Sequence, residues 1–153
     1  MWKDQIPLAL SDQEDIRVVL VTKDFSIVIA DDDQDDRSFI KEALLRRAFC
    51  GRFQCVEDGG QLLQYLKRTE KTLPDLILLD LNMPLVDGYQ ALSEIKQDPV
   101  LKSIPTMILT SSSKPEDEPV CYELGCDKFY RKPLSMGEYD DVASDILDYV
   151  RSV

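Results

Sequence analysis

One segment sets the architecture of this chain: Leu76-Ile77-Leu78-Leu79-Asp80-Leu81-Asn82-Met83-Pro84. Four consecutive apolar residues end directly at a carboxylate, Asp80. Strands with continuous apolar sequences are usually buried on both faces of a parallel sheet. In open α/β sheets, ligands bind just outside the carboxyl ends of such strands. Asp80 is therefore poorly placed for packing and well placed for chemistry.

Two other strand-like runs also end in polar residues. Ile27-Val28-Ile29-Ala30 is followed by Asp31-Asp32-Asp33, and Met107-Ile108-Leu109 is followed by Thr110-Ser111-Ser112. The carboxyl ends of parallel strands share one edge of the sheet, so these runs would bring carboxylates and a hydroxyl together. The convergence predicts one functional site.

Apolar runs alternate with helical patterns from Phe25 onward. After each expected strand, apolar residues recur with helical spacing. The expected strands are 27–30, 53–56, 76–79, 107–109 and 128–130. This pattern predicts a single α/β domain in which right-handed crossovers place helices on both faces of a parallel sheet.

Caps and prolines mark the helix boundaries. Asp33 or Asp35 is the expected N-cap of the first helix. A later helix would begin at Gly88 and stop before Pro99, because proline disfavours the helical conformation at the preceding residue. The expected apolar faces are Phe39, Ile40, Ala43, Leu44 and Ala48 in the first helix, Leu62, Leu63, Tyr65 and Leu66 in the second, and Tyr139, Val142, Ala143, Ile146, Leu147 and Val150 in the last.

Residues 1–24 form an N-terminal extension ahead of the domain at 25–153. Ile16-Arg17-Val18-Val19-Leu20-Val21 has strand character, and Lys23-Asp24 would turn it back toward Phe25. A two-residue hairpin turn normally uses Asn-Gly or Asp-Gly, however. An added edge strand and a loosely ordered tail are both compatible with this sequence.

The composition is that of an ordinary globular protein. The 153 residues suit one domain, and they are 44% hydrophobic and 31% charged. The net charge of −11 argues against direct binding to nucleic acid or to an anionic membrane, because both require a basic surface. No apolar run approaches the roughly 20 residues of a transmembrane helix. Residues 6–10 are too short for a signal peptide, so we expect a cytoplasmic protein.

Histidine is missing from the chain. Its absence excludes a Cys/His zinc site, a Ser-His-Asp triad and a phosphohistidine carrier. Cys50, Cys55, Cys121 and Cys126 show no CxxC spacing. We therefore expect these cysteines to be reduced and mostly buried.

The acids at the strand ends have a specific chemical implication. Alone, the acidic run from Asp31 to Asp36 would be explained by a solvated loop or a helix cap. Together with Asp80, Asp31 and Asp32 would repel one another, so that without a cation at least one should have a raised pKa. Mg²⁺ prefers such carboxylates, and an aspartate beside it can attack a phosphoryl group. Thr110 and Lys132 would offer a hydroxyl and an ammonium to the phosphoryl oxygens.

The chain resembles the receiver domain of two-component response regulators over roughly Ser26 to Arg151. The matching segments are IVIADDD at 27–33, LLDLNMPLVDG at 78–88, ILTS at 108–111 and Lys132-Pro133. The resemblance implies a flavodoxin-like, doubly wound sheet of five parallel strands in the order 2-1-3-4-5, with five helices.

The resemblance also implies a role for each site residue, with Mg²⁺ as the cofactor. Asp80 would be the phosphoacceptor, and Lys132 would pair with the phosphoryl group. Thr110 would be the switch hydroxyl. Phe129 is compatible with an aromatic switch and equally with ordinary core packing. The implied metal ligands are Asp31, Asp32, Asp80 and the backbone carbonyl of Asn82.

The family's usual phosphodonor is a histidine kinase, and the receiver catalyses only its own phosphorylation and dephosphorylation. With no output domain in the sequence, the chain resembles single-domain regulators that act by docking to a partner protein. A homodimer through the fourth helix, fifth strand and fifth helix would combine Lys128 and Arg131 with acids of the last helix. The sequence leaves the kinase and the downstream target open.

Two alternatives compete with this interpretation. A phosphohydrolase of the haloacid-dehalogenase type also uses an aspartate nucleophile with Mg²⁺. It usually needs a second aspartate two residues later, where this chain has Asn82, and its nucleophile normally lies on the first strand. A pseudo-receiver keeps the fold without phosphorylation, but every residue that the chemistry needs is present.

Overall fold

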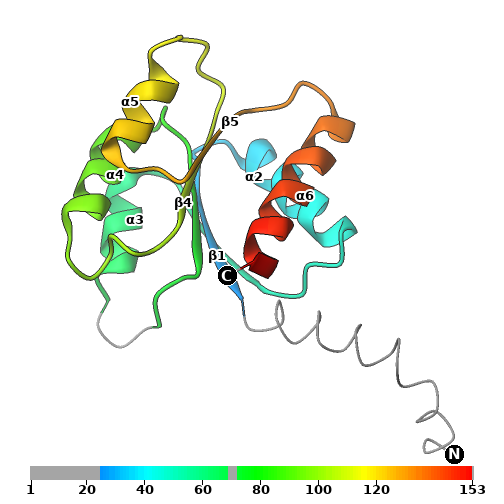
Figure 1. The fold of residues 1–153 in the computed structure, drawn as a ribbon, viewed down its shortest axis with the longest axis horizontal. Helices are drawn as coiled ribbons and strands as arrows, with labels where there is room; N and C mark the ends of the chain where they lie inside the picture. Colours follow the sequence, from blue (N-terminus) through cyan, green and yellow to red (C-terminus); the bar gives the residue numbers. More distant parts are fainter. Residues whose placement is uncertain (1–24, 69–71, 153) are drawn as a thin grey trace, which may run out of the picture.

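A computed structural model describes residues 25–68 and 72–152 of the chain. Within these residues, five parallel strands form one sheet of order β2-β1-β3-β4-β5, and five helices connect or follow them (Figure 1). The predicted flavodoxin-like fold is therefore confirmed. The strands are β1 (Ser26–Ala30), β2 (Arg52–Val56), β3 (Leu76–Leu79), β4 (Thr106–Thr110) and β5 (Lys128–Arg131). The helices are α2 (Gln34–Arg46), α3 (Gly59–Leu66), α4 (Gly88–Gln97), α5 (Asp117–Leu124) and α6 (Met136–Ser152).

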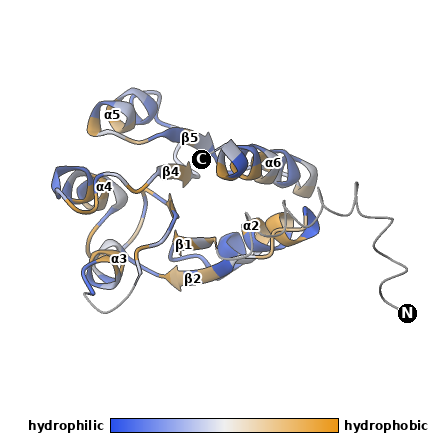
Figure 2. Ribbon diagram, turned by 60° about the horizontal axis from the view of Figure 1, so that its bottom comes forward, coloured by the Kyte–Doolittle hydropathy of each residue, from blue (hydrophilic) through white to orange (hydrophobic). Residues whose placement is uncertain are grey.

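Helices cover both faces of the sheet, as Figure 2 shows. α2 and α6 pack on one face, and α3, α4 and α5 pack on the other. Successive strand side chains point to opposite faces, so Ile27 and Ile29 join the first layer while Val28 and Ala30 join the second. Burial of a side chain as large as valine or isoleucine stabilises the fold by roughly 1.5–3 kcal/mol. The continuous apolar runs are thus buried on both sides, as predicted.

The helix boundaries follow the predicted caps, with one correction. Asp33 is the N-cap of α2, and its carboxylate accepts hydrogen bonds from the backbone N–H groups of Asp35 and Asp36. The prediction that Ala48 lies on the buried face of this helix is wrong. α2 ends at Arg46, and Ala48 lies beyond it, exposed and in the left-handed conformation with φ 63°. The turn brings Phe49 into the core in its place.

The remaining helix predictions agree with the structure. α4 begins at Gly88 and ends at Gln97, two residues before Pro99. The six apolar residues predicted for α6 are all buried. Within the described residues, no helix combines the length and the apolar character needed to cross a membrane.

Other predictions are met in part or lie outside the structure. All four cysteines are free, but only Cys121 and Cys126 are buried, while Cys50 is exposed and Cys55 is half-buried. The predictions for residues 1–24 lie outside the described residues. β1 pairs with β2 on one side and β3 on the other, so any additional strand of this sheet would have to lie beside β2 or β5.

Candidate metal and phosphoryl site

The register of the two central strands brings the predicted carboxylates together. Ala30 of β1 lies opposite Leu79 of β3, so the next residues, Asp31 and Asp80, leave the sheet side by side. The backbone N–H of Asp80 donates to the Ala30 carbonyl at 2.9 Å. Asp31, Asp32 and Asp80 each offer one carboxylate oxygen, and these oxygens lie within 4.8 Å of one another. The predicted convergence of the three acids is confirmed.

Local turns fix the orientation of the two buried acids. The Asp33 N–H donates to Oδ1 of Asp31 at 2.9 Å, and the Asn82 N–H donates to Oδ1 of Asp80 at 3.3 Å. Asp31 and Asp80 are only 4% and 3% exposed, whereas Asp32 is exposed. The remaining Oδ2 oxygens of the buried pair point toward a common partner, Lys132.

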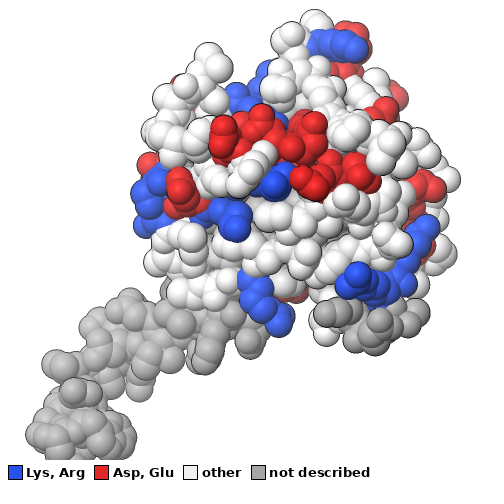
Figure 3. Space-filling view, turned by 180° about the vertical axis from the view of Figure 1, so that it is seen from behind, with Lys and Arg blue, Asp and Glu red and all other residues white. Residues whose placement is uncertain are grey.

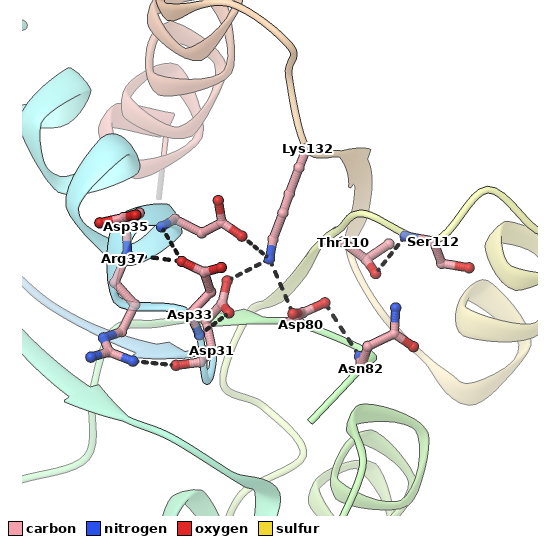
Figure 4. A network of polar contacts seen from close by, with 10 residues as sticks. Asp31, Asp33, Asp35, Arg37, Asp80, Asn82, Thr110, Ser112 and Lys132 are labelled. Carbon is pink, nitrogen blue, oxygen red and sulfur yellow. Dashed lines mark hydrogen bonds and ion pairs between the residues drawn. The ribbon is translucent and has the colours of Figure 1, made fainter. Parts of the chain in front are cut away.

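Lys132 lies in the segment that follows β5, and its ammonium contacts three carboxylates (Figure 4). Its Nζ atom lies 2.7 Å from Oδ2 of Asp31, 2.7 Å from Oδ2 of Asp36 and 3.1 Å from Oδ2 of Asp80. Its backbone N–H donates to the Thr110 carbonyl at 2.7 Å, which ties the lysine to the end of β4. The sequence prediction placed Lys132 at this edge correctly.

Burial and charge shift two pKa values in this group. The raised pKa of Asp31, about 6, results mainly from burial, and the hydrogen bonds from Lys132 and the Asp33 N–H oppose it. The charge of Asp80 raises it further but contributes least, so repulsion is a smaller cause than predicted. For Lys132, burial lowers the pKa, but hydrogen bonds to Asp31 and Asp36 together with nearby carboxylate charges raise it above its usual value. Lys132 is therefore an ammonium at neutral pH.

The oxygen donors fit a hard divalent cation. The converging carboxylate oxygens come from Asp31, Asp32 and Asp80. The ammonium of Lys132 contacts Asp31, Asp80 and also Asp36. The Arg37 guanidinium donates to the Asp31 backbone carbonyl at 2.6 Å. Asp and Glu side chains also gather in a band on the face of the molecule seen in Figure 3. Carboxylate oxygens are among the ligands that Mg²⁺ prefers.

A glycine sets the backbone around Asp80. A Cβ atom on Gly88 would lie 2.2 Å from the carbonyl oxygen of Asp80 and 2.6 Å from the Cα of Leu81. Only glycine therefore allows α4 to begin directly against the end of β3. The Gly88 N–H donates to the Leu81 carbonyl at 3.0 Å and fixes this contact.

A second polar network lies beside the carboxylates, around the loop after β4. Thr110 is fully buried, and its hydroxyl accepts a hydrogen bond from the Ser112 N–H at 3.2 Å. The buried carboxylate of Asp117 accepts hydrogen bonds from the hydroxyls of Ser112 and Tyr89. Arg131 donates to the Ser112 carbonyl and, at 3.1 Å, to the Lys114 carbonyl. This network connects the predicted switch hydroxyl to α4, α5 and β5.

Phe129 lies on β5 and is partly buried against the core layer of α3, α4 and α5. The Arg131 guanidinium lies 5.2 Å from the centre of its ring. This contact is within the range of a cation–π interaction. The side chain thus packs against the core, and its role as a switch stays a prediction.

Sequence reasoning missed two acids of these networks. Asp36 lies three residues, about one helical turn, after the Asp33 cap. This spacing places it on the same side of the helix as the cap, so its position near the site could have been predicted. Asp117 stands between Glu116 and Glu118, and such a run is typical of a solvated surface. Nothing in that sequence distinguishes the buried acid from its exposed neighbours.

Comparison with known proteins identifies the family. The model of the response regulator receiver domain matches residues 27–143. The chain belongs to this family. This membership also removes the basis for the haloacid-dehalogenase alternative.

Relatives of this receiver domain include proteins of similar length. Probable methanogenesis regulatory protein FilR2 of Methanothrix harundinacea is 34% identical over 128 residues, which cover 82% of this chain and 83% of that protein. Response regulator Rcp1 of Synechocystis sp. is 34% identical over 114 residues, covering 72% and 78%. In the peroxide stress-activated histidine kinase mak1 of Schizosaccharomyces pombe, by contrast, the similar region is 8% of the protein.

Solved structures agree with the fold. The phosphorylated cyanobacterial phytochrome response regulator RcpA has a TM-score of 0.78 and 32% identity, over 84% of this chain and 95% of that one. The Mn²⁺-bound form of response regulator Rcp1 has a TM-score of 0.77 and 29% identity, over 84% and 96%.

Proposed function

We propose that this receiver domain is a phosphorylation-activated signalling switch, in which Mg²⁺-dependent transfer of a phosphoryl group onto Asp80 changes docking to a partner protein. The observation that carries the proposal is the meeting of three carboxylates and Lys132 at the carboxyl ends of β1 and β3. The phosphorylated and Mn²⁺-bound states of similar regulators support it.

In the proposed reaction, Asp80 is the nucleophile toward the phosphohistidine of a histidine kinase. An Asp80 carboxylate oxygen forms a bond to phosphorus, the nitrogen–phosphorus bond breaks, and the released imidazole takes up a proton from water. The Asn82 N–H holds the Asp80 carboxylate through Oδ1. Lys132 already contacts Oδ2 of Asp80 and would pair with the phosphoryl oxygens.

The proposed metal ligands are Asp31, Asp32, Asp80 and the backbone carbonyl of Asn82. When bound, Mg²⁺ supplies charge neutralisation for the phosphoryl oxygens. The protein contributes the orientation of the acids, because Asp31 is anchored through Oδ1 to the Asp33 N–H.

The switch needs more than one new contact. Moving a two-state equilibrium from 1:99 to 99:1 requires about 5.5 kcal/mol of differential stabilisation. One hydrogen bond to a charged group supplies roughly 1.5–3 kcal/mol. We propose that Thr110 and Lys132 both contact the phosphoryl group and that Phe129 responds, because β5 adjoins the Thr110 strand.

The proposed protein partners are a histidine kinase and an unidentified downstream target. A homodimer through α5, β5 and α6 is a further proposal. On that face Lys128 is exposed near Asp145 and Asp148 of α6, whereas Arg131 already binds carbonyls of its own chain. Sedimentation velocity before and after phosphorylation tests the dimer, and an unchanged monomer would exclude it.

The function is tested by intact-protein mass spectrometry after incubation with acetyl phosphate. We expect a gain of one phosphoryl group that requires Mg²⁺ and is abolished in Asp80→Asn. Asp75→Asn is the matched control, because Asp75 is also an aspartate at an end of β3 but lies at the opposite edge. The pseudo-receiver alternative predicts no gain in any of the three proteins.

A further inference from the structure

The ammonium of Lys132 lies among three carboxylates in this structure. An ammonium has three N–H donors and no more. Three carboxylates lie within reach of Nζ: Asp31 and Asp36 at 2.7 Å and Asp80 at 3.1 Å. The lysine side chain is 7% exposed, so water has little access to it.

Asp36 differs from the other two partners of Lys132. It lies on the first turn of α2 rather than at a strand end, and its side chain is 26% exposed. The Asp36 N–H donates to the N-cap carboxylate of Asp33 at 3.1 Å, which fixes its backbone. Asp36 is also outside the group of Asp31, Asp32 and Asp80 whose oxygens converge.

A phosphoryl group on Asp80 would change the competition for Lys132. It brings additional strong acceptor oxygens, which would compete with the three carboxylates for the three N–H donors of the ammonium. One existing contact must therefore weaken when the phosphoryl group is bound. Phosphorylation turns the Asp80 carboxylate into an acyl phosphate, so the contact of Asp80 with Lys132 would pass to the phosphoryl oxygens. Asp31 would share its charge with the bound cation, which leaves Asp36 as the carboxylate whose ion pair with Lys132 competes with the phosphoryl group.

We infer that Asp36 is a positioning residue that competes with the phosphoryl group for Lys132 and thereby limits the stability of the phosphorylated state. The inference rests on the proposed function. It assigns to the start of α2 a direct influence on phosphorylation, through one ion pair between segments 96 residues apart.

Asp35 provides a matched control for this inference. It lies in the same first turn and carries the same charge, but it is exposed. Replacement of either acid by asparagine removes one favourable interaction with the positive end of the helix dipole. Only the Asp36 replacement removes a contact with Lys132.

The experiment measures binding of beryllium fluoride (BeF₃⁻), a noncovalent mimic of a phosphoryl group, to the Mg²⁺-loaded protein by tyrosine fluorescence. We expect Asp36→Asn to bind about fivefold more tightly than the wild type, as the loss of a partly exposed ion pair predicts. Asp35→Asn should stay within about twofold of the wild type, since exposed charges are screened. Asp36→Glu, which keeps the carboxylate, should resemble the wild type.

A double-mutant cycle shows whether Asp36 acts through the lysine. In the Lys132→Ala background, Asp36→Asn should change the affinity for BeF₃⁻ no more than Asp35→Asn does. An Asp36→Asn affinity equal to that of Asp35→Asn in the wild-type background would overturn the inference while leaving the proposed function intact. Failure of the wild-type protein to bind BeF₃⁻ with Mg²⁺ would reject both.

Discussion

Aspartates flank strands at both edges of this sheet, and they serve different purposes there. At the amino edge, Asp75 accepts a hydrogen bond from the Ser26 N–H at 2.8 Å, and Asp127 accepts one from the Thr106 N–H at 2.8 Å. The same pairs are joined in the reverse direction by backbone bonds, Asp75 N–H to Ser26 and Asp127 N–H to Thr106. These carboxylates join neighbouring strands.

At the carboxyl edge, neighbouring strands present acids to each other. In both Asp31 and Asp80, Oδ1 accepts a hydrogen bond from the backbone N–H two residues later, and Oδ2 contacts the ammonium of Lys132. Both are nearly fully buried, whereas Asp75 and Asp127 are exposed. The two kinds of aspartate therefore differ in what their carboxylates face. Those that accept a hydrogen bond from a backbone N–H of the neighbouring strand are structural. Those that face another aspartate are candidate metal ligands.

The largest difference between the edges should appear in metal binding. Asp31→Asn should lower the affinity for Mg²⁺ by roughly 10–100-fold. Replacing a residue that only hydrogen-bonds to a metal ligand already lowers metal affinity by this much. Asp75→Asn should leave the affinity unchanged, because its carboxylate is at the opposite edge. Isothermal titration calorimetry measures both constants, and equal losses in the two variants would break the comparison.

At the carboxyl edge, we expect the acids to govern Mg²⁺ binding, and Thr110 and Lys132 to govern the response to a phosphoryl group. We expect Thr110→Ala and Lys132→Ala each to weaken the response to BeF₃⁻ roughly tenfold, the equivalent of one hydrogen bond to a charged group. Each variant should still bind Mg²⁺, because the three carboxylates remain. Tyrosine fluorescence follows both titrations, and loss of Mg²⁺ binding in both variants would contradict the assignment of roles.

At the amino edge, the expected effect is on stability. Asp127→Ala should lower the free energy of unfolding by about 1 kcal/mol, because the N–H of the buried Thr106 loses its acceptor. Phosphorylation of Asp80 should be unaffected. Urea denaturation measures the change against Asp148→Ala, whose side chain is exposed on α6. A similar small effect in both variants would show that the strand contact contributes nothing.

The smallest effects concern two strained residues, one toward each edge. Leu85, after β3, and Ala48, before β2, have φ values of 66° and 63°. A left-handed conformation costs a non-glycine residue roughly 1–2 kcal/mol, and glycine would remove this cost. Glycine also makes the unfolded chain more flexible, which offsets part of that stabilisation. Leu85→Gly and Ala48→Gly should each raise the stability by about 0.5 kcal/mol. A lower urea midpoint for either variant would contradict this.

Local signals explain what the sequence could predict. The strands, the Asp33 cap and the end of α4 depend on apolar runs and on residues close in the chain. The meeting of Asp31 and Asp80 follows once the strands are parallel and neighbouring. These features require no knowledge of side-chain packing.

The missed features depend on packing between distant segments. Asp36 is joined to the site through Lys132, which lies 96 residues further along the chain. Asp117 is buried because Tyr89 and Ser112 surround its carboxylate. At least one of Asp31, Asp32 and Asp80 was expected to have a pKa raised by repulsion. The pKa of Asp31 is raised, but mainly by its burial, which cannot be derived from a list of acids.

The central claim is that Asp80, among the clustered acids, accepts the phosphoryl group. Borohydride reduction converts an aspartyl phosphate to homoserine, which peptide mass spectrometry then locates in the sequence. After incubation with acetyl phosphate and Mg²⁺, we predict homoserine at position 80 and at no other aspartate. Homoserine at position 31 or 32, or none at all in the presence of Mg²⁺, would contradict the claim.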